Sequence, residues 1–277
     1  MKYHGWFKPQ HDLAYAKRAL QAGLHGFEII AGQSHYHLEE FKTYRENIKR
    51  IKEELQPSFT VHAPITDINL GSINRRIREA SLADVQAALE LAREVEALAV
   101  AVHASPGILA MPGGKWSKET ASPPVQAELI QQEGLLVQAL QKLADYAPDV
   151  LICLENLVYP HELYRSPGEM EGLLGQVNRS NVRLTLDVGH AVVAGCSPQD
   201  FVQRLFDHIF HVHLHDNHGT VDEHLPLGQG TIDYVGVVQA LYQAGYQGAI
   251  TLEFFLDNPE EYSKYLLQFE RVTNNLE

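Results

Sequence analysis

Residues 182–215, VRLTLDVGHAVVAGCSPQDFVQRLFDHIFHVHLH, contain the pattern that decides the fold. Two β-rich runs, 182–188 and 209–215, flank a helix-like segment at 198–208. The pair Ser197–Pro198 is typical of a helix start, with serine as the N-cap and proline in the first turn. A strand, a helix and a second strand in this order are the repeating unit of parallel α/β proteins.

The same unit recurs along the chain, where eight β-rich runs alternate with eight helix-like segments. The predicted strands are 3–7, 26–30, 58–63, 98–104, 150–156, 182–188, 209–215 and 249–254. The predicted helices are 12–22, 39–55, 75–97, 125–147, 167–178, 198–208, 233–244 and 259–275. Eight such units predict an α/β fold, a single (β/α)8 TIM barrel, with residues 1–277 as one domain. A doubly wound open sheet is the alternative, but it would not need eight units.

One long irregular stretch interrupts this alternation. Residues 111–124, MPGGKWSKETASPP, follow the fourth predicted strand. Loops at the carboxyl ends of barrel strands usually cover the active site, so this stretch is predicted to form a lid.

The composition narrows the class of protein. The 277 residues can bury a large core, and no apolar run approaches the roughly 20 residues of a membrane span. Cys153 and Cys196 give no disulfide framework, and the first residues lack the apolar centre of a signal peptide, so we expect a cytoplasmic protein. The net charge of −13 disfavours nonspecific nucleic-acid binding, although bound metal ions would add positive charge locally.

Good metal ligands stand at the carboxyl ends of the predicted strands and in the loops that follow, where barrel enzymes have their active sites. The nine candidates are His62, His103, Glu155, Asp187, His190, His213, Asp222, His224 and Glu253. One such residue alone is more often structural than a ligand. However, four carboxylates that converge in a partly buried mouth would repel one another, and a cation removes this conflict. The joint pattern therefore predicts a site for divalent metal ions.

The run FHVHLHDNHGTVDEHLPLGQG, residues 210–230, supplies several of these ligands. Side chains alternate along a strand, so His211, His213 and His215 share one face. We expect His211 to lie deeper in the barrel as a structural residue, and His215 to contact substrate near the mouth. Asn156, beside Glu155, is a second candidate for substrate binding.

Seven motifs together resemble the xylose isomerase-like barrel superfamily, which contains endonuclease IV (AP endonuclease family 2) and many sugar isomerases and epimerases. The motifs are VHAPITDINLGS, VAVHASPG, ICLEN, LTLDVGHA, HVHLHDN, DEHLPLGQG and TLEFF, and the resemblance covers most of the chain. It implies a minimal single-metal site at Glu155, Asp187, His213 and Glu253.

The resemblance to endonuclease IV implies a larger cluster of up to three Zn²⁺ ions, with Mn²⁺ as an alternative. Five further positions match its ligands: His62, His103, His190, Asp222 and His224. One ion would bind His62, His103 and Glu155, and a second the four residues of the minimal site. The third would bind His190, Asp222 and His224.

The charge of the site separates two chemistries. One divalent ion among three carboxylates leaves a charge of about −1, which suits a neutral sugar and a glutamate that moves a proton beside the carbonyl. Three ions among four carboxylates leave about +2, which suits an anionic phosphoester. The full set therefore predicts a metal-dependent hydrolase with Glu155 and Glu253 as catalytic residues. A single-metal sugar (phosphate) isomerase or epimerase is the alternative, and a metal-dependent sugar- or phosphate-binding module is a third hypothesis.

Two departures from the endonuclease pattern weigh against DNA with an abasic site as the substrate. Residues 63–67, APITD, replace the bulky residues that intrude into the duplex in the endonucleases. Basic residues cluster only modestly, at 75–78 and around Lys115 and Lys118. We therefore expect a small-molecule phosphoester or sugar as substrate.

Overall fold

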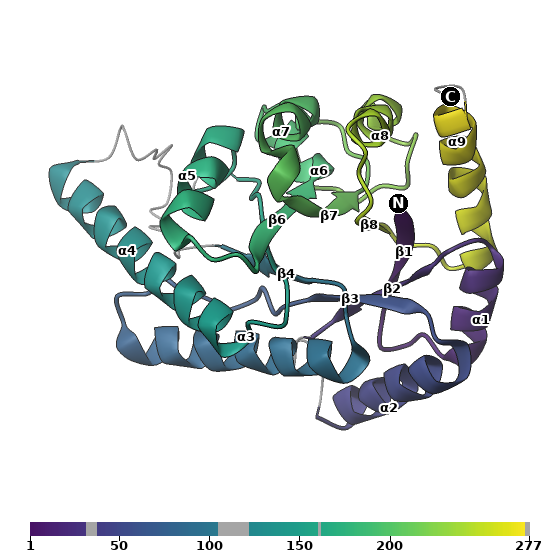
Figure 1. The fold of residues 1–277 in the computed structure, drawn as a ribbon, viewed down its shortest axis with the longest axis horizontal. Coiled ribbons are helices and arrows are strands. Elements are labelled where there is room, and N and C mark those ends of the chain that lie inside the picture. Colours follow the sequence, from purple (N-terminus) through teal and green to yellow (C-terminus); the bar gives the residue numbers. More distant parts are fainter. Residues whose placement is uncertain (32–37, 105–121, 160–161, 275–277) are drawn as a thin grey trace.

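Eight parallel strands close into a barrel in chain order, which confirms the predicted (β/α)8 fold (Figure 1). This computed structural model describes residues 1–31, 38–104, 122–159 and 162–274. The strands are β1 Lys2–Phe7, β2 Gly26–Ile30, β3 Ser58–His62, β4 Val100–His103, β5 Ile152–Glu155, β6 Val182–Asp187, β7 Ile209–Leu214 and β8 Ala249–Leu252. β1 pairs with β8, so the sheet has no free edge in this closed order.

Helices surround the barrel, and each predicted helix overlaps an observed one (Figure 1). They are α1 Leu13–Gln21, α2 Leu38–Leu55, α3 Arg75–Val95, α4 Pro123–Tyr146, α5 Pro167–Val177, α7 Pro198–Leu205, α8 Tyr234–Gln243 and α9 Tyr262–Asn274, with short 3₁₀ turns η2 Phe206–His208 and η3 Pro259–Glu261. A further short helix, α6 Val188–Val193, follows β6 where only a loop was expected.

Ser-Pro pairs begin two of the helices, α5 and α7, and the sequence predicted this for the pair Ser197–Pro198. Ser166 caps α5, and the Glu169 side chain accepts a hydrogen bond from the Ser166 backbone N–H at 2.9 Å, completing a capping box. Ser197 precedes Pro198 at the start of α7. The Ser166 cap thus fixes where the chain leaves the loop after β5, whereas the Ser197 side chain makes no capping hydrogen bond.

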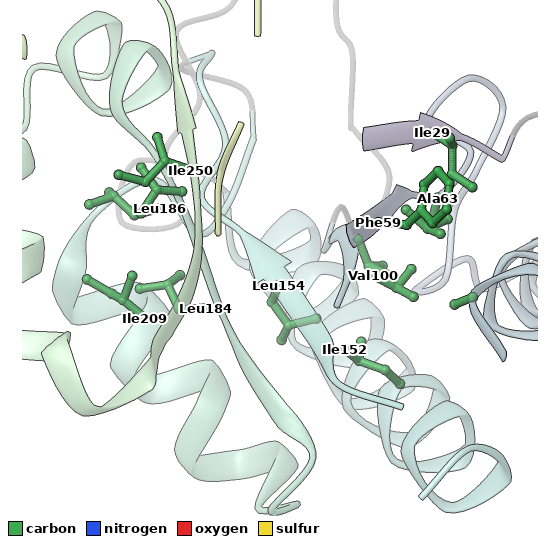
Figure 2. Packing of buried hydrophobic residues seen from close by; sticks show 14 of the residues in the cluster. Ile29, Phe59, Ala63, Val100, Ile152, Leu154, Leu184, Leu186, Ile209 and Ile250 are labelled. Carbon is green, nitrogen blue, oxygen red and sulfur yellow. The ribbon is translucent and has the colours of Figure 1, made fainter. Parts of the chain in front are cut away.

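The strands alternate between two environments. Their apolar side chains belong to one buried layer that packs against the helices, and Figure 2 shows part of it, including Ile152, Leu154 and Leu184. The alternate positions carry buried polar side chains, and because side chains alternate along a strand these residues face the barrel interior. They are His4, Glu28, Thr60, His62, Glu155, Thr185, Asp187, His211, His213 and Thr251. The barrel interior is therefore unusually polar, since such interiors are mostly filled by branched apolar residues.

Most of the predicted lid at 111–124, together with Lys115 and Lys118, lies outside the residues that the structure describes. Among the helices that are described, none is both long and apolar enough to cross a membrane.

Candidate metal centre

The nine predicted ligands gather at the carboxyl end of the barrel. His62, His103, Glu155 and Asp187 are the last residues of β3, β4, β5 and β6. His213 lies one residue before the end of β7, and Glu253 directly follows β8. His190 lies in α6, whereas Asp222 and His224 lie in the loop after β7. Parallel strands thus bring together side chains that are far apart in sequence.

Four buried residues form the first group. The group consists of Glu155, Asp187, His213 and Glu253, and one potential ligand atom from each lies within 4.8 Å of the others. The Nδ1 atom of His213 lies 3.0 Å from Glu253 Oε2, 3.3 Å from Glu155 Oε1 and 3.7 Å from Asp187 Oδ2. Three carboxylates around one imidazole nitrogen are a donor set that suits a divalent ion.

A second group shares Glu155 with the first. The Oε2 atom of Glu155 lies 3.4 Å from His62 Nε2 and 3.3 Å from His103 Nε2. The three residues form a compact group that could hold a metal ion. Glu155 therefore stands between two donor groups, as the resemblance implied.

A third group gathers around Asp222. Its Oδ2 atom lies 3.3 Å from His190 Nε2 and 2.9 Å from His224 Nε2. His215 joins this group, with its Nε2 atom 3.6 Å from Asp222 Oδ1 and 3.3 Å from Asp187 Oδ1. The structure thus places His215, which we expected to contact substrate, among residues that could hold a metal ion.

Asp216 organises the loop that carries Asp222 and His224. Its buried carboxylate accepts hydrogen bonds from the backbone N–H groups of Gly228 and Gly230, at 2.8 and 3.0 Å, and from Ile232 at 3.0 Å. The backbone N–H and C=O groups of Asp216 also bond to those of Leu225, and these bonds join the two sides of the loop. These bonds hold both ends of the loop, and the segment between them presents the two ligands.

Backbone carbonyls orient three of the histidines. The Nδ1 atoms of His62, His190 and His224 lie 2.8, 2.9 and 2.9 Å from the carbonyl oxygens of Ala63, Asn156 and Glu253. A carbonyl can only accept a hydrogen bond, so Nδ1 is the nitrogen that carries the proton. In the neutral ring Nε2 then keeps a free lone pair, and in each case Nε2 faces a carboxylate of the site.

Several buried atoms of the site have no hydrogen-bond partner among the described residues. In the first group these atoms are Asp187 Oδ2, His213 Nδ1 and Glu253 Oε2, and in the second group the atom is Glu155 Oε2. In the third group they are Asp222 Oδ1 and both ring nitrogens of His215. Buried polar atoms normally have partners, because leaving one unsatisfied is costly. The residues present therefore fit a divalent cation, which would bind these atoms.

The charges of these buried groups shift one another's pKa values. Burial raises the pKa of Glu155, but the nearby His103 and His213 outweigh burial and hold this pKa well below its usual value. Burial lowers the pKa of His62, yet the contact with Glu155 and its charge outweigh burial and raise the pKa to about 8. His224 is raised to about 9 in the same way, by Asp222 and Glu253. Without a cation, protons on His62 and His224 offset part of the charge of the buried carboxylates.

Asn156 is fully buried and bonded to the backbone of Asp187. Its side-chain amide donates to the Asp187 carbonyl at 2.9 Å, and its side-chain oxygen accepts from the Asp187 N–H at 2.8 Å. Both polar atoms of the Asn156 side chain thus bind the backbone of Asp187, whereas we expected Asn156 to bind substrate.

Gly189 gives His215 the room that it needs. A Cβ atom at Gly189 would lie 1.9 Å from His215 Cε1, so the imidazole would have to move. We expect Gly189→Ala to destabilise the protein by about 1–3 kcal/mol, as overpacking of a buried site does. Chemical denaturation would measure this loss. Gly175→Ala, at an open position in α5, is the control and is expected to be neutral or slightly stabilising. Equal stability of the two variants would contradict the argument.

A cavity of about 220 Å³ opens above the metal-binding groups. Its polar lining includes His62, His103, Glu155, His190, Asp222, His224 and Glu253. Its apolar lining includes Trp6, Ile30, Ala63, Pro64 and Ile65. Trp6 stacks on His224 and on Phe255, with ring centroids 5.9 and 5.0 Å apart. A small molecule in this cavity would meet both the ligand cluster and an aromatic surface.

Glu28 is a functional candidate that the sequence reasoning missed. Its carboxylate is fully buried and contacts His213 and His211 inside the barrel. The available signal was a charged residue in the middle of an otherwise apolar strand, GFEII. Such a residue is rarely buried without a partner.

Comparisons with known proteins agree with this architecture. A curated relative, fructoselysine 3-epimerase of Escherichia coli O157:H7, is 23% identical, with 90% of this chain and 89% of the relative covered. Uncharacterized protein MJ1311 of Methanocaldococcus jannaschii is 29% identical over 89% of this chain and 80% of its own. The crystal structure of a D-tagatose 3-epimerase-like protein superposes with a TM-score of 0.79 at 26% identity, with 99% of each chain covered. Residues 16–271 match the profile described as xylose isomerase-like TIM barrel. The chain therefore belongs to the xylose isomerase-like TIM barrel family.

Proposed function

We propose that this protein is a metal-dependent sugar epimerase or isomerase whose divalent ion is held by Glu155, Asp187, His213 and Glu253. The observation that carries the proposal is that His213 Nδ1, Asp187 Oδ2 and Glu253 Oε2 are buried and unsatisfied and lie in one group with Glu155, whose Oε1 atom is 3.3 Å from His213 Nδ1. The epimerase names of the relatives favour this sugar-converting alternative over the phosphoester hydrolase that the full set of nine ligands predicted.

The two glutamates supply the proton transfer in this proposal. Epimerisation removes a proton from the carbon beside a carbonyl and returns a proton to the opposite face, so two carboxylates can divide the task. Glu155 and Glu253 both line the cavity, and the depressed pKa of Glu155 keeps this carboxylate ionised at neutral pH. A divalent ion, when bound, would polarise the carbonyl and acidify the neighbouring C–H group.

The cavity lining supports a neutral small molecule. Neither lysine nor arginine occurs among the described residues that line it. Trp6 offers a flat aromatic surface for the C–H face of a sugar, while the carboxylates and histidines of the lining can bind its hydroxyl groups. We place Asn156 as a residue that positions Asp187, and His215 in the group around Asp222. In this proposal, residues 1–277 work as one domain.

Deuterium incorporation tests the proposal directly. The Mn²⁺-loaded protein is incubated with a panel of ketoses in deuterated water, and the products are analysed by NMR spectroscopy. We expect deuterium at the carbon next to the carbonyl, because the proton removed there exchanges with solvent. Metal-free protein is the control and is expected to leave the sugars unlabelled. If the metal-loaded protein also labels no ketose across a broad panel, the proposal fails.

A phosphoester hydrolase with three metal ions is the second candidate. The observation that favours it is the third group, in which Asp222 and His215 also have unsatisfied buried atoms beside His190 and His224. A single-metal epimerase does not need these ligands. Elemental analysis of purified protein separates the candidates, since about three Zn²⁺ or Mn²⁺ ions per chain would favour the hydrolase. One ion per chain would favour the epimerase.

A further inference from the structure

Glu28 lies in the barrel interior directly below the metal-binding groups. It occupies the middle of β2 and is paired in register with Trp6 on one side and Thr60 on the other. Its side chain is fully buried, between the outward-facing Phe27 and Ile29. A buried carboxylate in this position must be stabilised by hydrogen bonds or by an opposite charge.

The carboxylate of Glu28 contacts two histidines and a threonine. Its Oε1 atom lies 3.1 Å from His213 Nε2, and its Oε2 atom lies 3.2 Å from His211 Nε2. The Thr251 hydroxyl also donates to Oε2. Unlike Glu155 or Glu253, Glu28 has no unsatisfied oxygen, although it could be grouped with His211 and His213 as a metal site. Its bonding is complete without a cation, so we interpret it as a hydrogen-bond acceptor for the histidines.

This contact determines which nitrogen of His213 faces the metal-binding groups. A carboxylate at Nε2 accepts a hydrogen bond from the N–H group of that nitrogen, so Nδ1 of the neutral ring carries the lone pair. Nδ1 is the atom that lies 3.0 Å from Glu253 Oε2 and 3.3 Å from Glu155 Oε1. The arrangement is reversed relative to His62, His190 and His224, whose Nδ1 atoms bond to backbone carbonyls. A carboxylate partner also makes the imidazole a stronger ligand than a carbonyl partner does.

We propose that Glu28 is a positioning residue of the metal centre, which fixes the tautomer and the ring orientation of His213 and touches neither metal nor substrate. The inference rests on the proposed function, because it requires an ion at the group that contains His213. It adds to the proposed function a deeper layer of the metal centre, which is contributed by β2. No residue of β2 belongs to the three groups.

Metal affinity tests the role of Glu28 without an activity assay. Glu28→Gln keeps the shape of the side chain and removes its charge. We expect its affinity for Mn²⁺ or Co²⁺, measured by titration against a chelating indicator, to fall by roughly 10–100-fold. The d–d absorption of bound Co²⁺ is expected to change as well. Thr60→Val is the matched control, since Thr60 is also buried in the interior, pairs with Glu28 in register, and bonds to His4 at 3.1 Å.

The outcomes separate this inference from the proposed function. If the unaltered protein binds no divalent ion, the proposed function fails. If it binds the ion and Glu28→Gln binds equally tightly, only the role of Glu28 fails. Imidazole ¹⁵N chemical shifts of the unaltered Zn²⁺-loaded protein give a second test that needs no variant. The proton of His213 is expected on Nε2, and a proton on Nδ1 would overturn the inference.

Discussion

Glu253→Gln is expected to lower kcat for sugar epimerisation by roughly 10²–10⁴-fold, the usual contribution of a general acid–base group. Glu253 lines the cavity and its Oε2 atom has no hydrogen-bond partner among the described residues. Glutamine has nearly the same shape, but its amide cannot take up a proton from carbon. Steady-state kinetics with an active ketose, at saturating Mn²⁺, would measure the loss.

A control variant and a Mn²⁺ titration show whether the loss of kcat comes from the missing proton transfer. Glu223→Gln is the control, because Glu223 is exposed on the same side of the barrel, where it bonds to His218, and it is absent from the cavity lining. Its kcat is expected to stay within two-fold of the unaltered protein, on the order of the scatter for surface changes. Because Glu253 is also a proposed ligand, kcat is followed as Mn²⁺ is raised. Full recovery at high Mn²⁺ would show that Glu253 only binds the ion and does not move the proton.

Local patterns were enough to predict the barrel. Strand and helix periods are set by neighbouring residues, and eight repeats of one unit leave few other closed arrangements. The short helix α6 escaped this reasoning because six residues, VGHAVV, cover less than two turns. Its N-cap is Asp187, a residue that also ends β6. The candidate ligand, the end of the strand and the start of the helix thus coincide at Asp187. The helix that follows is too short to show a helical period in the sequence.

The candidate ligands could be predicted because each marks a strand end or the loop after one, and all strand ends of a barrel meet at one mouth. The contacts between side chains could not. Glu28 and His213 are 185 residues apart, and nothing local in either strand indicates their hydrogen bond. Asn156 stands next to Glu155 in sequence, yet its amide binds the backbone of Asp187 on the neighbouring strand. His215 joins the group around Asp222 because Gly189 leaves space for its ring.

Removal of the divalent ion is expected to lower the melting temperature by roughly 8–16 °C. A ligand at 1,000 times its Kd adds about 4 kcal/mol to the stability, and each kcal/mol shifts Tm by about 2–4 °C in a chain somewhat smaller than this one. Asp187→Asn should abolish most of this difference. Asparagine keeps the N-cap bond that Asp187 accepts from the His190 N–H at 2.6 Å, but it lacks the negative charge. Asp145→Asn, which alters a surface pair with Arg179, is the control.

The difference in Tm should also grow with pH between about 6.5 and 9. The pKa of His62 rises from 6.5 to about 8 in the metal-free fold, and that of His224 rises to about 9. A raised pKa means that protonation stabilises the fold below pH 6.5, and that this contribution is lost as the pH passes through 8 and 9. A divalent ion held by Glu155 and Glu253 would neutralise carboxylates that raise the pKa values of His62 and His224, so these protons oppose metal binding, which strengthens over the same pH range. Thermal unfolding with and without Mn²⁺ would measure both effects, and a gap in Tm that stays constant or narrows from pH 6.5 to 9 would contradict the proposed exchange of protons for metal.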